Sequence, residues 1–259
     1  VRIPPIRYTE KESEHSAPPM KLSEMPPILF EDQNIMVVDK PAGMASHGGS
    51  GISYGLIERM RASRPELPFL ELVHRLDRGT SGVLVLAKTR KALVRLHEMI
   101  REGEMHKTYQ ALVKGDWQND RQHAKFPLFK YVTPSGERRV RVDPENGLPS
   151  HSIFRLKERF GPVSLVEVDL LTGRTHQIRV HAAELGFPLV GDEKYGDFAF
   201  NDEVAHGSLG VPFKRMFLHS GKICFHHPIT GEELEIEAPL PKDCVELIEV
   251  LEQRKAQNK

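Results

Sequence analysis

One stretch decides how this chain folds, and it reads Leu72-Val73-His74-Arg75-Leu76-Asp77-Arg78-Gly79-Thr80-Ser81-Gly82-Val83-Leu84-Val85-Leu86-Ala87-Lys88. A short apolar segment leads into a loop rich in charge and glycine. The continuous apolar run from Val83 to Ala87 follows the loop and predicts a strand buried on both faces. Because glycine permits positive φ and close backbone approach, the loop can turn tightly on this rigid strand.

The loop carries a single acid, Asp77, between Arg75 and Arg78. Nearby cations favour the ionised form of a carboxylate, which is the form that acts as a nucleophile. The same pattern also suits a turn with a structural ion pair. Spacing alone leaves both interpretations open and names Arg75 and Arg78 as the charge partners.

Composition sets the class of protein. The chain has 259 residues, 39% hydrophobic and 28% charged, which is typical of a soluble globular protein of one large or two small domains. No apolar run approaches the roughly 20 residues that span a bilayer, and the first residues contain no apolar signal segment. Two cysteines without metal-like spacing, Cys224 and Cys244, are typical of a reduced cytoplasmic protein.

Charge is balanced overall but unevenly distributed. Lys+Arg and Asp+Glu number 36 each, which argues against a protein that holds nucleic acid by bulk charge alone. Six basic residues and one acid lie between Arg121 and Arg141, whereas eight acids and four bases lie from Gly231 onward. The basic middle is compatible with polyanion binding, and equally with an ordinary solvated hairpin.

The first half of the chain predicts a linker followed by a domain. Residues 1–27 carry three Pro-Pro pairs and predict an extended linker outside the core, so the domain is expected to begin near Ile28. Two short apolar runs then predict a hairpin, and His47 begins a glycine-rich loop. The expected hairpin strands are 28–31 and 35–39, and the expected helices are 56–60 and 90–101, the second ended by Gly103.

The second half predicts more strands than helices. Expected strands cover 109–115, 152–156, 163–170, 189–192 and 216–220, with a hairpin over 131–142 and a helix over 244–254. A further helix is expected after Gly173, capped by Thr175 and ended by Gly186, with Ile178 and Ala182 on its apolar stripe. Strands joined by short turns favour an α+β fold, with a central mixed, mostly antiparallel sheet and helices packed on it.

Several site classes are excluded by spacing. His176 and His181 are five residues apart, and His226 and His227 are adjacent, so neither pair predicts a metal site. No G-x-S-x-G elbow accompanies Ser81, and no nucleotide-binding glycine motif is present, so no cofactor is expected. A carboxylate, a distant cation, a tyrosine and a basic surface together suggest chemistry on a nucleic-acid base.

Four motifs, in order, resemble those of the RluA-type pseudouridine synthases. They are Lys40-Pro41-Ala42-Gly43, His74-Arg75-Leu76-Asp77-Arg78-Gly79-Thr80-Ser81-Gly82, Lys107-Thr108-Tyr109 and Thr172-Gly173-Arg174-Thr175-His176-Gln177-Ile178-Arg179-Val180-His181. The resemblance runs from about Ile28 to about Pro241. It implies the pseudouridine synthase fold, with residues 28–259 as the catalytic domain, and an isomerase that converts uridine in RNA to pseudouridine without a cofactor.

The resemblance also implies roles for individual residues. Asp77 would be the catalytic aspartate, attacking C1′ of the ribose or C6 of the base. Tyr109 would stack on the flipped base and help to remove the C5 proton. Arg179, rather than Arg75 or Arg78, would pair with Asp77. Unstacking the target costs a few kcal/mol, and an aromatic platform returns about 1–3 kcal/mol per base.

RNA binding is expected from residues around these three. Arg75 would fill the space that the flipped uridine leaves, since a guanidinium can pair and stack there. The full set of expected RNA-binding residues is Arg75, Arg78, Lys107, Arg138, Arg139, Arg174 and His176.

The N-terminal residues suggest the substrate. Val1-Arg2-Ile3-Pro4-Pro5 resembles the last strand and exit linker of an S4-type RNA-binding domain, as found in ribosomal large-subunit members of the family. We therefore expect residues 1–27 to follow an absent or truncated S4 domain. The expected substrate is 23S large-subunit ribosomal RNA during assembly, with tRNA as the alternative, and the expected state is a cytoplasmic monomer. A non-catalytic RNA-binding module and a metal-dependent nuclease are the competing functions.

Overall fold

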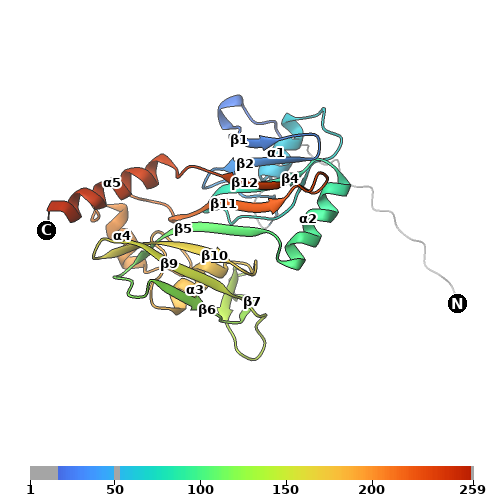
Figure 1. The fold of residues 1–259 in the computed structure, drawn as a ribbon. Coiled ribbons are helices and arrows are strands. Elements are labelled where there is room, and N and C mark those ends of the chain that lie inside the picture. Colours follow the sequence, from blue (N-terminus) through green and yellow to red (C-terminus); the bar gives the residue numbers. More distant parts are fainter. Residues whose placement is uncertain (1–16, 50–52, 258–259) are drawn as a thin grey trace.

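The computed structural model describes residues 17–49 and 53–257, and a ten-stranded sheet runs through them (Figure 1). Its main path has the order β1-β2-β4-β11-β5-β10-β9-β6, with β3 paired to β4 and β12 paired to β11. The strands are β1 (Ile28–Glu31), β2 (Ile35–Lys40), β3 (Glu71–Leu72), β4 (Ser81–Ala87), β5 (His106–Lys114), β6 (Arg121–Ala124), β9 (Ser152–Arg159), β10 (Val163–Leu170), β11 (Leu218–His226) and β12 (Glu233–Glu237). The β4–β11 pair is parallel and the other pairs are antiparallel, so the predicted mixed, mostly antiparallel sheet is confirmed.

Strand β4 is the buried strand that the opening stretch predicted. All seven of its residues are buried, and it lies between β2 and β11. At its start Gly82 has φ 112°, and a Cβ there would lie 2.1 Å from the carbonyl oxygen of Ser220 on β11. Only glycine allows this close approach. The Asp77 loop is therefore joined directly to the centre of the sheet.

Helices pack on both faces of the sheet. They are α1 (Leu56–Ser63), α2 (Arg90–Glu102), α3 (Gln177–Glu184), α4 (Phe198–Ala205) and α5 (Lys242–Gln257). Apolar residues of α1 and α3 share one core cluster with β2, β4 and β5. The opposite faces of the strands pack against α2 in a second cluster and against α4 and α5 in a third, and α2 and α5 lie toward opposite ends of the molecule (Figure 1).

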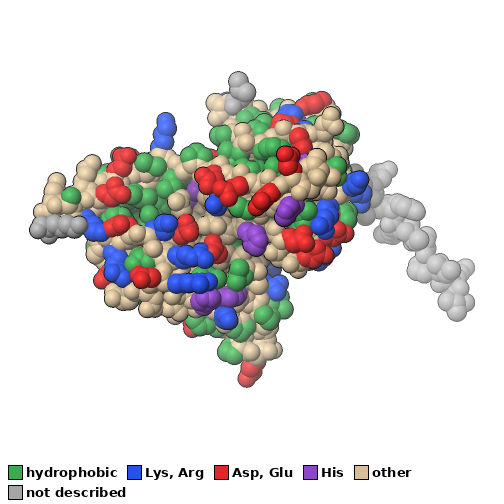
Figure 2. All heavy atoms as spheres, in the orientation of Figure 1, with side chains coloured by type: hydrophobic (Ala, Val, Ile, Leu, Met, Phe, Trp, Pro, Cys, Tyr) green, Lys and Arg blue, Asp and Glu red, His purple; other side chains and the backbone are tan. Residues whose placement is uncertain are grey.

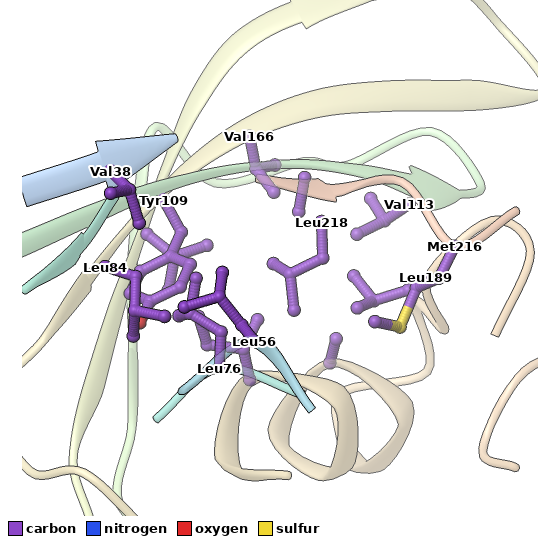
Figure 3. Packing of buried hydrophobic residues seen from close by; sticks show 14 of the residues in the cluster. Val38, Leu56, Leu76, Leu84, Tyr109, Val113, Val166, Leu189, Met216 and Leu218 are labelled. Carbon is purple, nitrogen blue, oxygen red and sulfur yellow. The ribbon is translucent and has the colours of Figure 1, made fainter. Parts of the chain in front are cut away.

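The α1–α3 cluster reaches the residues of the predicted site. Figure 3 shows Tyr109 of β5 at the end of this cluster where Leu76 and Leu84 lie, away from Leu189 and Met216. Leu76 precedes Asp77 and is 4% exposed. Burying an apolar side chain of this size contributes about 1.5–3 kcal/mol. The core therefore anchors the aspartate loop through its neighbour.

A separate two-stranded hairpin lies beside α3. It consists of β7 (Leu128–Val132) and β8 (Arg138–Val142), and its existence confirms the hairpin predicted over 131–142. Leu128 and Val140 pack against Val180 of α3. This contact holds the basic hairpin against the helix that carries the predicted arginine.

Residues 17–27, the described part of the predicted linker, do not all lie outside the core. Residues 1–16 lie outside the described residues, but Met20 is only 7% exposed and belongs to the α1–α3 cluster. Its backbone N–H donates to Ser63 Oγ at 2.8 Å, and a short 3₁₀ helix, η1 (Leu22–Glu24), follows. Packing thus begins before Ile28, because the apolar side chain of Met20 finds a place on α1. That residues 1–27 follow an absent or truncated S4 domain stays a prediction.

Two predictions of local structure were wrong. Residues 189–192 form a turn with one isolated bridge, Val113 to Leu189, instead of a strand. The predicted strand over 216–220 starts at Leu218 and extends to His226. Strands β6 and β12 and helix α4 were not predicted. β6 and α4 carry no clear apolar period, whereas the alternation of Leu234 and Ile236 with glutamates in β12 was a strand signal that was overlooked. In the part of the chain described, no helix is both long and apolar enough to cross a membrane.

Candidate active site

A cavity of about 390 Å³ opens where the Asp77 loop, β5 and the start of α3 meet. Its wall includes Asp77 from the loop, Lys107 and Tyr109 from β5, and His176 and Arg179 from the segment that begins α3. These residues lie up to about a hundred positions apart in the chain. The fold therefore brings together all three side chains that were expected to be catalytic.

Asp77 lies at the edge of this cavity with its carboxylate partly open to solvent. Its side chain is 21% exposed, and Arg179 Nη1 donates to Asp77 Oδ2 at 3.1 Å. The resemblance-based expectation of this ion pair is confirmed. The pairing with Arg75 or Arg78 that spacing suggested was wrong: Arg78 Nε donates to the carbonyl of Gly43 at 3.0 Å, and Arg75 is an exposed cavity-lining residue.

Arg179 is held from behind by a second carboxylate. Its Nε and Nη2 donate to Asp192 Oδ2 and Oδ1, each at 2.7 Å, and Asp192 is fully buried. Burial alone would lower the pKa of Arg179, but its bonds to Asp192 and Asp77 raise that pKa overall. Burial likewise favours a raised pKa for Asp192, and the guanidinium and backbone N–H groups lower it below its ordinary value. The bidentate bond leaves only Nη1 to face Asp77.

His176 enters helix α3 in an unusual backbone conformation. It is the N-terminal cap residue, with φ 54° and no side-chain cap bond, so the expected cap at Thr175 was wrong. Its Nδ1 lies 2.7 Å from Tyr195 Oη, and its Nε2 lies 3.9 Å from Asp77 Oδ2. Burial is the main cause that lowers the pKa of His176 to about 4, so the ring is neutral at pH 7. Left-handed non-glycine residues cluster at functional sites.

Tyr109 supplies an aromatic wall. It is 6% exposed, lines the cavity, and its hydroxyl is bonded to Ser220. Burial raises the pKa of Tyr109, so the phenol keeps its proton at neutral pH. Lys107 lies two residues earlier on the same face of β5, and burial lowers its pKa to about 8. The cavity thus joins the flat ring of Tyr109 to the partly buried amine of Lys107.

All seven expected RNA-binding residues line this cavity or a second one. The second cavity, of about 630 Å³, lies between the loop at 45–49 and the β7–β8 hairpin and shares Arg75 and His176 with the first. Arg174 and Lys107 line the first cavity, and Arg78, Arg138 and Arg139 line the second. The two cavities therefore adjoin, and together they form a trough whose charged lining residues are mainly basic. That these residues bind RNA stays a prediction.

The surface seen in Figure 2 has a different character. On the face where β9 and β10 lie in front of α3, basic and acidic side chains are interspersed. Neighbours on the two strands pair across the ladder, as Lys157 does with Glu167 at 3.6 Å. Mixed charges give no track for a polyanion. This face therefore lacks the run of basic residues that the trough presents.

Sequence reasoning missed two residues of the site, Asp192 and Tyr195. Asp192 had been predicted as the last residue of a strand, and Tyr195 lay outside every predicted element. An acid and a tyrosine close to glycines were the only local signal. No group of three or more His, Cys, Asp or Glu side chains within residues 17–49 and 53–257 could hold a metal ion.

Comparison with known proteins identifies the class. The model of the RNA pseudouridylate synthase family matches residues 34–184, and the chain belongs to this family of RNA-modifying isomerases. The matched region contains Asp77, Tyr109 and Arg179. Their roles are taken up below as a proposal.

Within the family, the chain is similar to bacterial enzymes named ribosomal large subunit pseudouridine synthase C. It is 49% identical to that of Salmonella typhi over 255 residues, covering 97% of this chain and 78% of the relative. It is 49% identical to that of Escherichia coli K12 over 244 residues, covering 93% and 75%. The Pasteurella multocida enzyme is 47% identical over 262 residues, covering 100% and 78%.

Solved structures confirm the predicted pseudouridine synthase fold. Human RNA pseudouridylate synthase domain containing 1 superposes with a TM-score of 0.67 and 26% identity, covering 88% of this chain and 95% of that one. Human RNA pseudouridylate synthase domain containing 4 superposes with a TM-score of 0.68, 23% identity, and coverage of 87% and 92%. The second likeness concerns the fold alone.

Proposed function

We propose that this protein converts specific uridines to pseudouridine in large-subunit ribosomal RNA, with Asp77 as the nucleophile. The observation that carries the proposal is the ion pair in which Arg179 Nη1 holds Asp77 Oδ2 at 3.1 Å beside an open cavity. The fixed guanidinium keeps the carboxylate oriented and reactive. The RNA class follows from the printed names of the relatives.

The isomerisation breaks the bond between N1 of uracil and C1′ of ribose and forms one between C5 and C1′. The proton on C5 leaves, and N1 regains a proton, so no atoms are gained or lost. Asp77 attacks either C1′ of the ribose or C6 of the base. Asp77 Oδ2 is bonded to Arg179, whereas Oδ1 has no hydrogen bond to any described residue and is available for attack.

Tyr109 and Arg75 act on the target nucleotide. The target leaves the helical stack at a cost of a few kcal/mol, and the ring of Tyr109 offers a surface on which it stacks. Because burial raises the pKa of Tyr109, the group next to C5 is a neutral phenol bonded to Ser220. Arg75 is exposed and lines both cavities, where it can reach the vacated position in the RNA.

The remaining basic residues are proposed to track the phosphates. Arg78, Arg138 and Arg139 line the second cavity, and Lys107 and Arg174 line the first. His176, which was also expected to bind RNA, lines both cavities but carries no charge at pH 7. We infer that the enzyme acts without a cofactor, as the resemblance to the family implies, and that it acts as a monomer. We further infer that it works in the cytoplasm, on ribosomal RNA during ribosome assembly.

Tritium release tests the nucleophile. Pseudouridine formation frees tritium from RNA labelled at uracil C5, and we expect Asp77→Asn to abolish release while RNA affinity stays within a few fold. Asp120→Asn removes an exposed carboxylate outside both cavities and should release tritium at the wild-type rate. Full turnover by Asp77→Asn would refute the proposed mechanism. A wild-type protein that binds several RNAs tightly without releasing tritium would favour a binding module.

A further inference from the structure

The turn from Asp192 to Tyr195 touches both groups that face Asp77. Asp192 forms the bidentate bond to Arg179, and Tyr195 Oη lies 2.7 Å from Nδ1 of His176. The same turn is fixed internally, because Asp192 Oδ1 accepts the backbone N–H groups of Lys194 and Tyr195 at 2.8 and 3.1 Å. One short segment therefore controls the position of both neighbours of the carboxylate.

The turn is also joined to the basic hairpin. The backbone N–H of Val140 on β8 donates to Tyr195 Oη at 2.9 Å, and Arg139 Nη1 donates to the carbonyl of Lys194 at 3.3 Å. Lys194 Nζ donates to the carbonyl of Arg138 at 3.2 Å. Tyr195 thus lies between the hairpin and His176, with its ring 5.1 Å from the guanidinium of Arg179.

The hydrogen bonds of Tyr195 favour one direction for its hydroxyl proton. A phenol has one hydrogen to donate, and its oxygen already accepts the N–H of Val140. The acceptor within reach among the described residues is Nδ1 of His176, so the hydroxyl proton points there. A neutral imidazole that accepts at Nδ1 carries its proton at Nε2. That nitrogen lies 3.9 Å from Asp77 Oδ2.

We propose that Tyr195 is a positioning residue, which holds neutral His176 as the Nε2–H tautomer with that proton directed toward Asp77. This inference rests on the proposed role of Asp77 as the nucleophile. The N–H donor and Arg179 both face the same carboxylate oxygen, Oδ2, which leaves Oδ1 free to attack. The separation of 3.9 Å closes to a hydrogen bond with a small movement of the ring.

Nitrogen-15 NMR of labelled protein without RNA tests the tautomer. We expect His176 to show a protonated Nε2 and an unprotonated Nδ1 at pH 7, and Tyr195→Phe to populate the other tautomer. His219 is an internal control: its Nδ1 is 2.9 Å from Ser81 Oγ and its Nε2 is 3.0 Å from the carbonyl of Ala238, so its signals should not move. A protonated Nδ1 in wild-type His176 overturns the proposal.

Kinetics test whether Tyr195 acts through His176. We expect Tyr195→Phe to lower kcat about tenfold, the size expected for one lost hydrogen bond, with RNA affinity within about threefold. His176→Asn keeps a residue that tolerates the left-handed backbone. In that background the effect of Tyr195→Phe should disappear, because the coupling energy of a double-mutant cycle reports their contact. An undiminished tenfold effect overturns the proposal.

The two readouts separate this inference from the proposed function. The tautomer is measured without substrate, so it stands or falls independently of any activity of Asp77. If wild-type protein releases no tritium but His176 has the expected tautomer, the proposed function fails and the hydrogen-bonded arrangement remains. If turnover depends on Asp77 but Tyr195→Phe changes neither the tautomer nor kcat, only the inference about Tyr195 fails.

Discussion

Arg179 is the residue on which the geometry of the site depends most. Its three guanidinium nitrogens are divided between two carboxylates, two nitrogens to Asp192 and one to Asp77. A lysine could not reproduce this division, because an ammonium lacks the planar fork of donors. Because Asp192 makes the bidentate bond to the guanidinium, Asp77 needs to bind it through only one oxygen. The Asp77 carboxylate, the proposed nucleophile, can then stay partly open to the cavity.

Asp192→Asn tests this support. The change leaves the buried guanidinium with a single carboxylate partner, so we expect a loss of about 3–5 kcal/mol in the free energy of unfolding at pH 7. Turnover should fall as well, since Arg179 loses the bonds that orient it. Urea unfolding and tritium release measure the two effects. The exposed Asp202→Asn is the matched control and should change stability by no more than about 0.5 kcal/mol.

The pH dependence of stability gives an independent check on Asp192. Its folded-state pKa lies below the ordinary value of 3.8, so its contribution is present above that pH and is lost as pH falls through the lower folded value. The asparagine variant has no such group to protonate. The stability difference between wild type and variant should therefore narrow below about pH 3.8. A difference in the free energy of unfolding that stays constant below pH 3.8 would contradict the ion pair between Asp192 and Arg179.

At the scale of elements, the β7–β8 hairpin has a structural role and a proposed role in RNA binding. Arg139 is engaged internally, with Glu137 at 2.9 Å and the carbonyl of Lys194 at 3.3 Å. Arg138 is exposed, lines the second cavity and has no ion pair with any described residue. Its carbonyl accepts from Lys194, a bond that a change of side chain leaves in place. Arg138 is therefore the hairpin arginine whose charge is available to RNA.

Arg138→Gln should weaken RNA binding without disturbing the fold. Losing one phosphate contact is expected to reduce the slope of log affinity against log salt by about one, while thermal stability stays unchanged. Filter binding over a range of salt concentrations measures the slope. Lys214→Gln removes an exposed cation outside both cavities and should leave the slope at its wild-type value. Equal slopes for the two variants would remove Arg138 from the RNA path.

Local pattern was enough to predict most elements but not the turn that completes the site. The buried strand β4, the two hairpins and helices α1, α2 and α5 follow apolar period and turn residues that act over a few positions. Residues 189–192 look like a strand by the same criteria. They form a turn because Asp192 bonds to Arg179 and to backbone N–H groups farther along the chain. Such contacts exist only once the chain has folded.

The same limit applies to the partners of Asp77. Spacing selected Arg75 and Arg78, which are close in sequence, but the structure pairs Asp77 with an arginine 102 positions away. No sequence pattern around Asp77 indicates its pairing with Arg179, which was expected only from the resemblance to a known family. Tyr195 carried no such signal at all, because its role depends on a single hydrogen bond to His176. Charge and geometry in the folded site decide these roles.

Over the whole molecule, the distribution of charged residues matters more than the net charge, which is zero. Basic and acidic residues balance at 36 each, yet the charged residues that line the trough are mainly basic, with Asp77 as the acid among them. The face in Figure 2 carries both signs. A protein with this distribution gains little from non-specific attraction to RNA and depends on contacts within the trough. This organisation suits an enzyme that selects particular uridines within a large RNA.

The substrate is tested by mapping pseudouridines in cells that lack the protein. We expect uridines of large-subunit ribosomal RNA to stay unmodified, while tRNA positions are unaffected, because the relatives at about 49% identity are named for the large subunit. Wild-type protein should restore the lost sites and the Asp77→Asn protein should not. The Asp77→Asn variant, which we expect to be inactive, keeps the residues proposed to bind RNA, so it separates modification from any effect of binding alone. Loss of pseudouridine from tRNA, with ribosomal RNA modified as usual, would instead make tRNA the substrate. A platform such as Tyr109 would stack on any flipped uridine, so the choice between RNAs would lie with flanking contacts in the trough.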